Sequence, residues 1–176
     1  NMFNQKTGEW VFHAGPVFAE IVLADEINRA SPKTQSALLE VMEEAQVTVD
    51  GVRRPAPQPF MVIATQNPVE QAGTYPLPEA QLDRFLMKTS IGYPSRSAMI
   101  DVLDGSASPD RSKNLRPLVT GQDIVAWAAL ASANHTDRAV LDYVAALAEA
   151  TREDESSLLG VSTRGAIGMV RCARVW

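Results

Sequence analysis

The fold of this chain is decided by a short stretch that reads, over residues 21–28, Ile21-Val22-Leu23-Ala24-Asp25-Glu26-Ile27-Asn28. Its first four residues are apolar, a run long enough for a buried strand and too short for a helix. Such runs are typical of parallel sheets that are covered on both faces. The run stops at two adjacent carboxylates, Asp25 and Glu26. Because ligands bind at the carboxyl ends of the strands in open α/β sheets, this position favours a functional site.

Two adjacent acids at the end of a strand suit metal-assisted phosphoryl transfer. One carboxylate can hold Mg²⁺, usually through its water ligands, while the other orients or deprotonates an attacking water. Apolar runs that end in Asp-Glu also begin ordinary polar loops. Taken alone, Asp25 and Glu26 therefore leave both interpretations open.

A second apolar run predicts a neighbouring strand. Residues 60–65 read Phe-Met-Val-Ile-Ala-Thr, and they lead into Gln66 and Asn67 before Pro68 closes the segment. Two buried strands would then both present polar residues at their ends.

The order of these motifs resembles that of the AAA+ ATPases, and within them the MoxR family. The resemblance covers nearly the whole chain and rests on four segments: residues 15–19 (Gly-Pro-Val-Phe-Ala), 24–33 (Ala-Asp-Glu-Ile-Asn-Arg-Ala-Ser-Pro-Lys), 64–68 (Ala-Thr-Gln-Asn-Pro) and 75–85 (Tyr-Pro-Leu-Pro-Glu-Ala-Gln-Leu-Asp-Arg-Phe). It implies an α/β fold in which a partial AAA+ parallel-sheet core with inserted β-hairpins occupies residues 1–93. A small all-α lid domain, incomplete, would follow over residues 94–176.

The resemblance also implies roles for five residues, all of which would contact the nucleotide. Asp25 would hold Mg²⁺, and Glu26 would act as the general base. Asn67 is similar to the sensor 1 asparagine, which positions the attacking water beside the γ-phosphate of ATP. Arg84 aligns with the arginine finger, which reaches the nucleotide of a neighbouring subunit. Arg164 aligns with the sensor 2 arginine, which contacts phosphate from the lid, and the resemblance leaves open whether it acts on its own subunit or an adjacent one.

Each of the last three residues also has a plainer explanation. An Asn-Pro pair such as Asn67-Pro68 commonly initiates a turn. Arg84 could form a salt bridge with Asp83 or another neighbour, although a planar guanidinium also suits the charge spread over transferring phosphoryl oxygens. Around Arg164 the sequence departs from the family pattern, since Thr163 replaces proline and Gly165 replaces alanine.

The position of Arg164 carries one further expectation. A cation at the start of a helix opposes the helix dipole, so an anion such as phosphate is expected nearby.

Three further elements are predicted in the first half of the chain. Residues 2–13 place aromatic side chains on both sides of a Thr-Gly turn, which indicates a hairpin. A helix is expected after the N-cap Ser31, with a core stripe of four residues: Leu38, Val41, Met42 and Ala45. Residues 46–52 alternate and carry Asp50-Gly51, the strongest short hairpin signal. The resemblance implies that the two hairpins correspond to the insert in the second core helix and to the pre-sensor hairpin.

The second half is predicted to be mostly helical. Residues 86–91 look like a last core strand, and residues 92–95 like a hinge. Helices are expected over residues 95–104, 122–131 and 137–152, and again from residue 162, with a polar connector over residues 105–117.

Composition limits the possible functions. The chain has 176 residues, 45% of them hydrophobic and 21% charged, and a formal net charge of −5. The acidic balance weighs against a dedicated nucleic-acid binder, although Arg53 and Arg54 form a local basic pair. Cys172 is the single cysteine, so no intrachain disulfide can form. No apolar stretch approaches the ~20 residues that span a bilayer, and no signal-peptide pattern begins the chain, so a cytoplasmic location is expected.

The phosphate-binding pattern Gly-x-x-x-x-Gly-Lys-Ser/Thr does not occur in this sequence. In the family this loop precedes the segment that resembles residue 1 onwards, so the chain is expected to be the later part of an ATPase and inactive by itself. The resemblance implies a ring, commonly a hexamer, that remodels client proteins with von Willebrand factor A-domain partners. Two other functions remain open at this point: a non-catalytic interaction domain that keeps the fold, and a nucleic-acid motor or transcriptional regulator.

Overall fold

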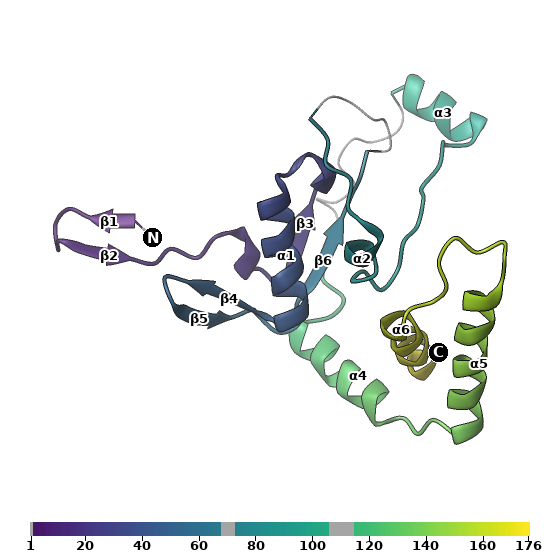
Figure 1. Cartoon of the computed structure of the whole chain (residues 1–176). Coiled ribbons are helices and arrows are strands. Elements are labelled where there is room, and N and C mark those ends of the chain that lie inside the picture. The colour runs from purple at the N-terminus through teal and green to yellow at the C-terminus, as the bar shows by residue number, and fades with distance from the viewer. Residues whose placement is uncertain (1, 68–72, 106–114) are drawn as a thin grey trace.

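The computed structural model of the chain describes residues 2–67, 73–105 and 115–176. Its centre is a short parallel sheet next to a helix, two hairpins extend from one side of this centre, and the second half of the chain is helical (Figure 1). In the described part of the chain, no helix has both the length and the apolar character needed to cross a membrane.

The parallel pair consists of β3 (Ile21–Ala24) and β6 (Met61–Ala64), the two strands expected from the apolar runs. Their register pairs Ile21 with Met61 and Ala24 with Ala64, so both strands end level with each other. The ladder continues past the strands, because Thr65 donates its backbone N–H to the Ala24 carbonyl over 3.0 Å. The residues that follow each strand therefore meet at one edge of the sheet.

Among the described residues, the two faces of the sheet differ in how well they are covered. Ala64 packs on the side where α1 lies, against a small core of Ile27, Leu39 and Leu77. Four strand residues share the opposite face and are each more than 40% exposed: Ile21, Leu23, Met61 and Ile63. The prediction of strands buried on both faces is therefore wrong for this face in the described residues.

Helix α1 (Pro32–Glu44) begins where its sequence predicts. The Ser31 side chain accepts a hydrogen bond from the Thr34 N–H, and Pro32 occupies the first turn. The predicted core stripe is partly wrong. Ala45 is the exposed C-cap residue with φ of 50°, whereas Leu39, which the stripe omits, is the most buried residue of the helix at 1% exposure.

Both predicted hairpins are present. The first joins β1 (Met2–Asn4) to β2 (Glu9–Val11), and the second joins β4 (Gln46–Val49) to β5 (Val52–Pro55). Asp50 and Gly51 both have positive φ, 52° and 75°, as a two-residue hairpin turn requires.

The predicted strand over residues 86–91 is wrong. These residues lie within the described part of the chain and form no strand after the short helix α2 (Glu79–Leu82). Met87 is 78% exposed and Ile91 is 99% exposed. A strand needs a neighbour for its backbone hydrogen bonds, and this segment pairs with neither β3 nor β6.

In residues 96–105 and 115–176 the structure has four helices, close to the predicted positions: α3 (Arg96–Leu103), α4 (Gly121–Ala133), α5 (Arg138–Glu153) and α6 (Thr163–Val175). Helix α6 packs against α4 and α5. Most of the predicted connector over residues 105–117 lies outside the described residues. At the start of α4, hydrogen bonds from the Thr120 hydroxyl and N–H lower the pKa of the Asp123 carboxyl.

Candidate active site

Thr65 links the two acids that follow β3. Its hydroxyl donates a hydrogen bond to Asp25 Oδ1 over 2.5 Å and accepts one from the backbone N–H of Glu26 over 2.9 Å. The Thr65 carbonyl in turn accepts the N–H of Ile27 over 2.9 Å. One residue at the end of β6 thus fixes the chain through Asp25, Glu26 and Ile27.

Glu26 has an uncommon backbone conformation. Its φ of 47° and ψ of 50° lie in the left-handed region, which non-glycine residues seldom adopt. Residues held in such sparsely populated regions cluster at functional sites, because the surrounding contacts must outweigh their cost. In this chain the Thr65 hydroxyl supplies one of these contacts by accepting the Glu26 N–H.

The Glu26 carboxylate faces two polar side chains. Its Oε2 lies 3.0 Å from Arg29 Nε, and its Oε1 lies 3.5 Å from Asn67 Nδ2. The carboxylate is about two-fifths exposed, at 38%. A water molecule could therefore reach it while the amide of Asn67 stands next to it.

Asn67 is held by Asn28 through a reciprocal pair of hydrogen bonds. Asn28 Nδ2 donates to the Asn67 carbonyl over 3.0 Å, and Asn28 Oδ1 accepts the Asn67 N–H over 3.4 Å. Asn28 is only 7% exposed, and its own carbonyl accepts the N–H of Tyr75 over 2.6 Å. These bonds join the loop after β6 to the loop after β3.

Gln35 anchors this arrangement from helix α1. Its side-chain amide donates to the Ile27 carbonyl over 3.0 Å and to the Tyr75 carbonyl over 2.8 Å, and the residue is 3% exposed. Sequence reasoning assigned no role to Thr65, Asn28 or Gln35. The available signal was the sequence position of the first two, since Thr65 lies two residues before Asn67 and Asn28 lies two residues after Glu26.

The structure therefore brings Asp25, Glu26 and Asn67 to one edge of the sheet. We call these three residues, together with Thr65, the acid cluster. Mg²⁺ is usually bound by one or two carboxylates together with waters and phosphate oxygens, so a single Asp25 carboxylate beside a hydroxyl fits this ion. Within the described residues, no group of three or more His, Cys, Asp or Glu side chains forms a closed metal site. The catalytic and metal-binding roles of these residues stay predictions.

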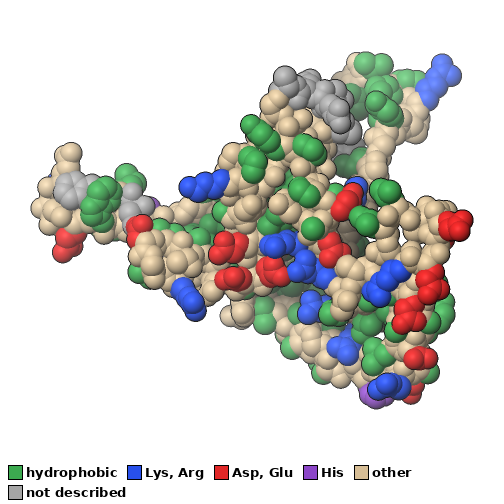
Figure 2. Space-filling view, in the orientation of Figure 1, with side chains coloured by type: hydrophobic (Ala, Val, Ile, Leu, Met, Phe, Trp, Pro, Cys, Tyr) green, Lys and Arg blue, Asp and Glu red, His purple; other side chains and the backbone are tan. Residues whose placement is uncertain are grey.

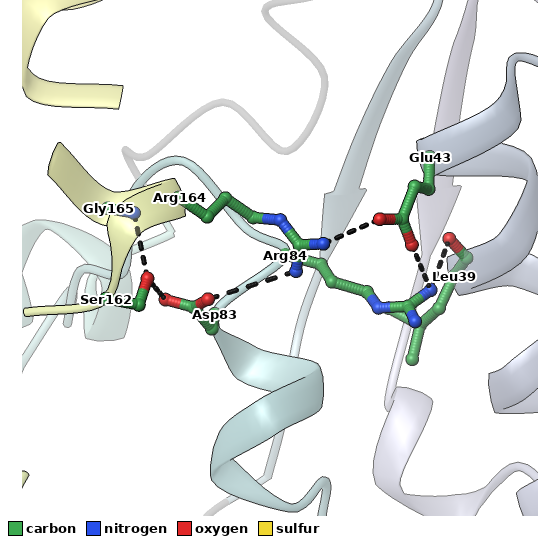
Figure 3. A network of polar contacts seen from close by, with 7 residues as sticks. All are labelled: Leu39, Glu43, Asp83, Arg84, Ser162, Arg164 and Gly165. Atoms are coloured by element: carbon green, nitrogen blue, oxygen red, sulfur yellow. Dashed lines mark hydrogen bonds and ion pairs between the residues drawn. The ribbon is translucent and has the colours of Figure 1, made fainter. Parts of the chain in front are cut away.

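The two predicted arginines lie elsewhere, around Glu43 (Figure 3). Arg84 Nη1 is 3.0 Å from Glu43 Oε2 and donates to the Leu39 carbonyl over 3.1 Å. Arg164 Nη2 is 2.6 Å from Glu43 Oε1. The partner of Arg84 is thus a residue of α1, distant in sequence.

Asp83 contacts the start of α6 instead. Its Oδ1 accepts a hydrogen bond from the Ser162 hydroxyl over 2.7 Å, and its Oδ2 lies 3.8 Å from Arg164 Nη1. The same Ser162 hydroxyl accepts the Gly165 N–H over 2.9 Å as the N-cap of α6. An anion was expected near Arg164, and in the structure the carboxylates of Asp83 and Glu43 fill this role.

A cavity of about 510 Å³ opens between α1, the end of α2 and α6. Its charged lining residues, which we call the arginine cluster, are Glu43, Asp83, Arg84, Arg164 and Arg171. Figure 2 shows acidic and basic side chains gathered in the middle of this face of the molecule. The volume falls within the range of small-molecule sites.

The acid cluster and the arginine cluster lie at opposite ends of α1. Gln35 contacts the loop beside the acids, and Glu43 stands in the last turn of the helix. Glu43 stands eight positions after Gln35, which corresponds to a rise of about 12 Å along the helix axis. The structure therefore joins three of the five predicted site residues in one group and the other two in a second group.

The basic pair at the second hairpin is also changed by the structure. Arg53 is exposed, but Arg54 is half-buried, and its guanidinium carbon stacks 3.6 Å from the ring centroid of Phe12. Phe12 packs edge-on against Phe18 with ring centroids 5.5 Å apart. Of the local basic pair, Arg53 is therefore the residue more exposed to solvent.

Comparisons with known proteins agree with this architecture. A model of the family described as "ATPase family associated with various cellular activities (AAA)" matches residues 1–87. A solved structure from Cytophaga hutchinsonii, described as a "putative ATPase", superposes with a TM-score of 0.84 at 40% identity. The superposition covers 98% of this chain and 55% of that one. The predicted fold class, a partial AAA+ α/β core followed by helices, is thereby confirmed.

Curated relatives narrow the class. An uncharacterized protein of Bacillus subtilis, YeaC, is 46% identical over 176 residues, which are 100% of this chain and 55% of the relative. Chaperone MoxR1 of Mycobacterium tuberculosis is 42% identical over 183 residues, which cover 98% of this chain and 48% of the relative. The chain belongs to the MoxR family of AAA+ ATPases. It spans about half the length of these relatives.

Proposed function

We propose that the full-length protein containing this chain is a Mg²⁺-dependent ATPase that couples ATP hydrolysis to the remodelling or maturation of protein complexes. The proposal rests above all on the Thr65 hydroxyl, which bridges Asp25 and the backbone of Glu26 at the paired strand ends. The chaperone name of the M. tuberculosis relative supports the remodelling role. The expected partners are protein clients and von Willebrand factor A-domain proteins, and the expected location is the cytoplasm.

In this proposal the acid cluster performs the chemical step. Asp25 would hold Mg²⁺, which when bound neutralises charge on the phosphate oxygens. Glu26 takes the proton of the attacking water, and the Asn67 amide, 3.5 Å from Glu26 Oε1, orients that water. Thr65 keeps both carboxyl-bearing residues in place.

The arginines of the arginine cluster would contact the nucleotide bound by a neighbouring subunit. Arg84 and Arg164 stand at the far end of α1 from Glu26, so they are poorly placed to reach the same γ-phosphate as that carboxylate. A ring of subunits, most simply a hexamer, would bring the arginine cluster of one chain to the acid cluster of the next. We therefore assign Arg84 as the finger and place Arg164 on the same neighbouring nucleotide.

The domain division is part of the proposal. Residues 1–93 would form the α/β core with both acid residues, Asn67 and Arg84, and residues 94–176 the lid with Arg164. The Ser162–Asp83 hydrogen bond supports a lid that rests on the end of the core.

The test is Glu26→Gln in the full-length protein. Loss of the general base lowers ATP turnover by about 10² to 10⁴-fold, while ATP binding measured by calorimetry persists. Glu40→Gln, an exposed carboxylate on α1, is the matched control and keeps wild-type turnover. Wild-type turnover in Glu26→Gln would remove Glu26 from its role, and no turnover in the unmodified protein would favour a non-catalytic interaction domain.

A further inference from the structure

Glu43 holds two guanidinium groups that come from different parts of the chain. One carboxylate oxygen lies 3.0 Å from Arg84 Nη1, and the other lies 2.6 Å from Arg164 Nη2 (Figure 3). Arg84 follows helix α2, whereas Arg164 stands in the first turn of α6. One side chain on α1 therefore sets the distance between the two cations.

The Glu43 carboxylate also offsets the repulsion between the two positively charged arginines. Two guanidinium groups repel each other at short range, and a carboxylate between them, with one oxygen for each, offsets that repulsion. Arg84 gains a second acceptor on the same helix, the Leu39 carbonyl at 3.1 Å. Helix α1 thus determines where the end of the Arg84 side chain lies.

Docking of α6 does not depend on Glu43 alone. The Ser162 hydroxyl donates to Asp83 over 2.7 Å, and a Cβ atom added at the buried Gly168 would stand 3.0 Å from Leu86 Cδ1. The close approach at Gly168 and the Ser162–Asp83 hydrogen bond are contacts between α6 and the core that do not involve Glu43. What Glu43 adds is the orientation of the two arginine side chains.

The three side chains remain accessible from the cavity. Their exposed fractions are 46% for Glu43, 31% for Arg84 and 46% for Arg164. A phosphate group that entered the arginine cluster could therefore meet both guanidinium groups at once, already separated by the width of one carboxylate.

We propose that Glu43 is a positioning residue that holds Arg84 and Arg164 side by side, so that both reach one phosphate group of the nucleotide bound by an adjacent subunit. The inference rests on the proposed function, in which both arginines act across the subunit boundary. Glu43 itself touches no nucleotide.

The first test needs no nucleotide. Glu43→Gln keeps the size of the side chain and removes its charge, so in the full-length protein Arg84 and Arg164 should react faster with an arginine-modifying dicarbonyl, followed by mass spectrometry. Arg171 lines the same cavity and is the internal control, with an unchanged rate. Glu40→Gln is the matched control on α1. Equal rates for Arg84 and Arg164 in wild type and Glu43→Gln would overturn the proposal.

The second test distinguishes an effect on turnover from an effect on ATP binding. Misplaced arginines should lower the kcat of Glu43→Gln about ten- to a hundredfold, with little change in KM for ATP, because its own acid cluster is intact. Subunits of Glu43→Gln mixed with subunits of Glu26→Gln should then regain turnover, since each supplies the half of the shared site that the other lacks. A fall in kcat that mixing does not relieve would overturn the proposal.

A mixture of Arg84→Ala with Glu26→Gln is the reference for this assay. Recovery in the reference mixture without recovery for Glu43→Gln overturns the role of Glu43 alone and leaves the proposed function standing. Failure of both mixtures contradicts the arrangement across subunits and with it the role of Glu43.

Discussion

Thr65 shows how one hydroxyl can organise two acids. It donates to the side chain of Asp25 and accepts from the backbone of Glu26, whose left-handed conformation would otherwise be unfavourable. The carboxylate of Glu26 is left to contact Arg29 and Asn67. Thr65 thus holds the backbone of Glu26, while the Glu26 carboxylate stays available for contacts with other side chains.

Thr65→Val should lower ATP turnover of the full-length protein by about tenfold, because the lost hydroxyl contributes hydrogen bonds of about 1.4 kcal/mol in total to the active arrangement. The Mg²⁺ concentration that gives half-maximal turnover should also rise, since Asp25 loses its partner. Steady-state kinetics at several Mg²⁺ concentrations measure both effects. Thr65→Ser retains the hydroxyl and is the control, and a Thr65→Val variant as active as Thr65→Ser would contradict this role.

At the scale of elements, helix α1 both supports the acid cluster and separates it from the arginine cluster. Gln35 near its start bonds the carbonyls of Ile27 and Tyr75, and Glu43 near its end bonds Arg84 and Arg164. Between them Leu39 is the most buried residue of the small core. A shift of α1 along its axis would disturb both clusters.

Gln35→Leu should lower the free energy of unfolding by about 1–3 kcal/mol, because the Ile27 and Tyr75 carbonyls lose their buried donor. Glu40→Leu places the same apolar side chain at an exposed position of the helix and should change stability far less. Chemical denaturation of the full-length protein, followed at the transition that reports this domain, measures the difference. Equal stability of the two variants would show that water replaces the Gln35 amide.

Helix starts and hairpin turns were predicted correctly where they depend on contacts between residues close in sequence. Ser31 and Pro32 fix the start of α1, and Asp50-Gly51 fixes the second hairpin, through contacts within a few residues. The segment 86–91 was wrongly predicted as a strand, because a strand depends on a partner that composition does not reveal. The level ends of β3 and β6 follow from their pairing, which the order of two apolar runs only suggests.

The candidate site was predictable in part for the same reason. Asp25, Glu26 and Asn67 each follow a recognisable apolar run, so their position at strand ends was expected. The partners Gln35 and Glu43 stand on a helix with other polar residues, and nothing in the pattern distinguishes them. Each makes a contact between segments 40 or more residues apart, as in the Gln35–Tyr75 and Arg164–Glu43 bonds.

For the whole molecule, the positions of the charged side chains are more informative about assembly than the net charge. The formal net charge is −5, yet the arginine cluster places three arginines around one cavity with two carboxylates. The acid cluster stands at the other end of α1. This placement supports the proposed assembly, in which the arginines of one subunit meet the acids of the next.

The chain spans about half the length of its relatives, so the nucleotide site is best tested in the full-length protein. The most direct measurement is hydrogen–deuterium exchange of the full-length Glu26→Gln protein with and without Mg²⁺ and a non-hydrolysable ATP analogue. The proposed site predicts slower exchange on binding in peptides covering residues 24–29 and 64–67, with the β1–β2 hairpin unchanged as the internal control. Bound analogue without slower exchange at either strand end would contradict the placement of the nucleotide beside Asp25, Glu26 and Asn67.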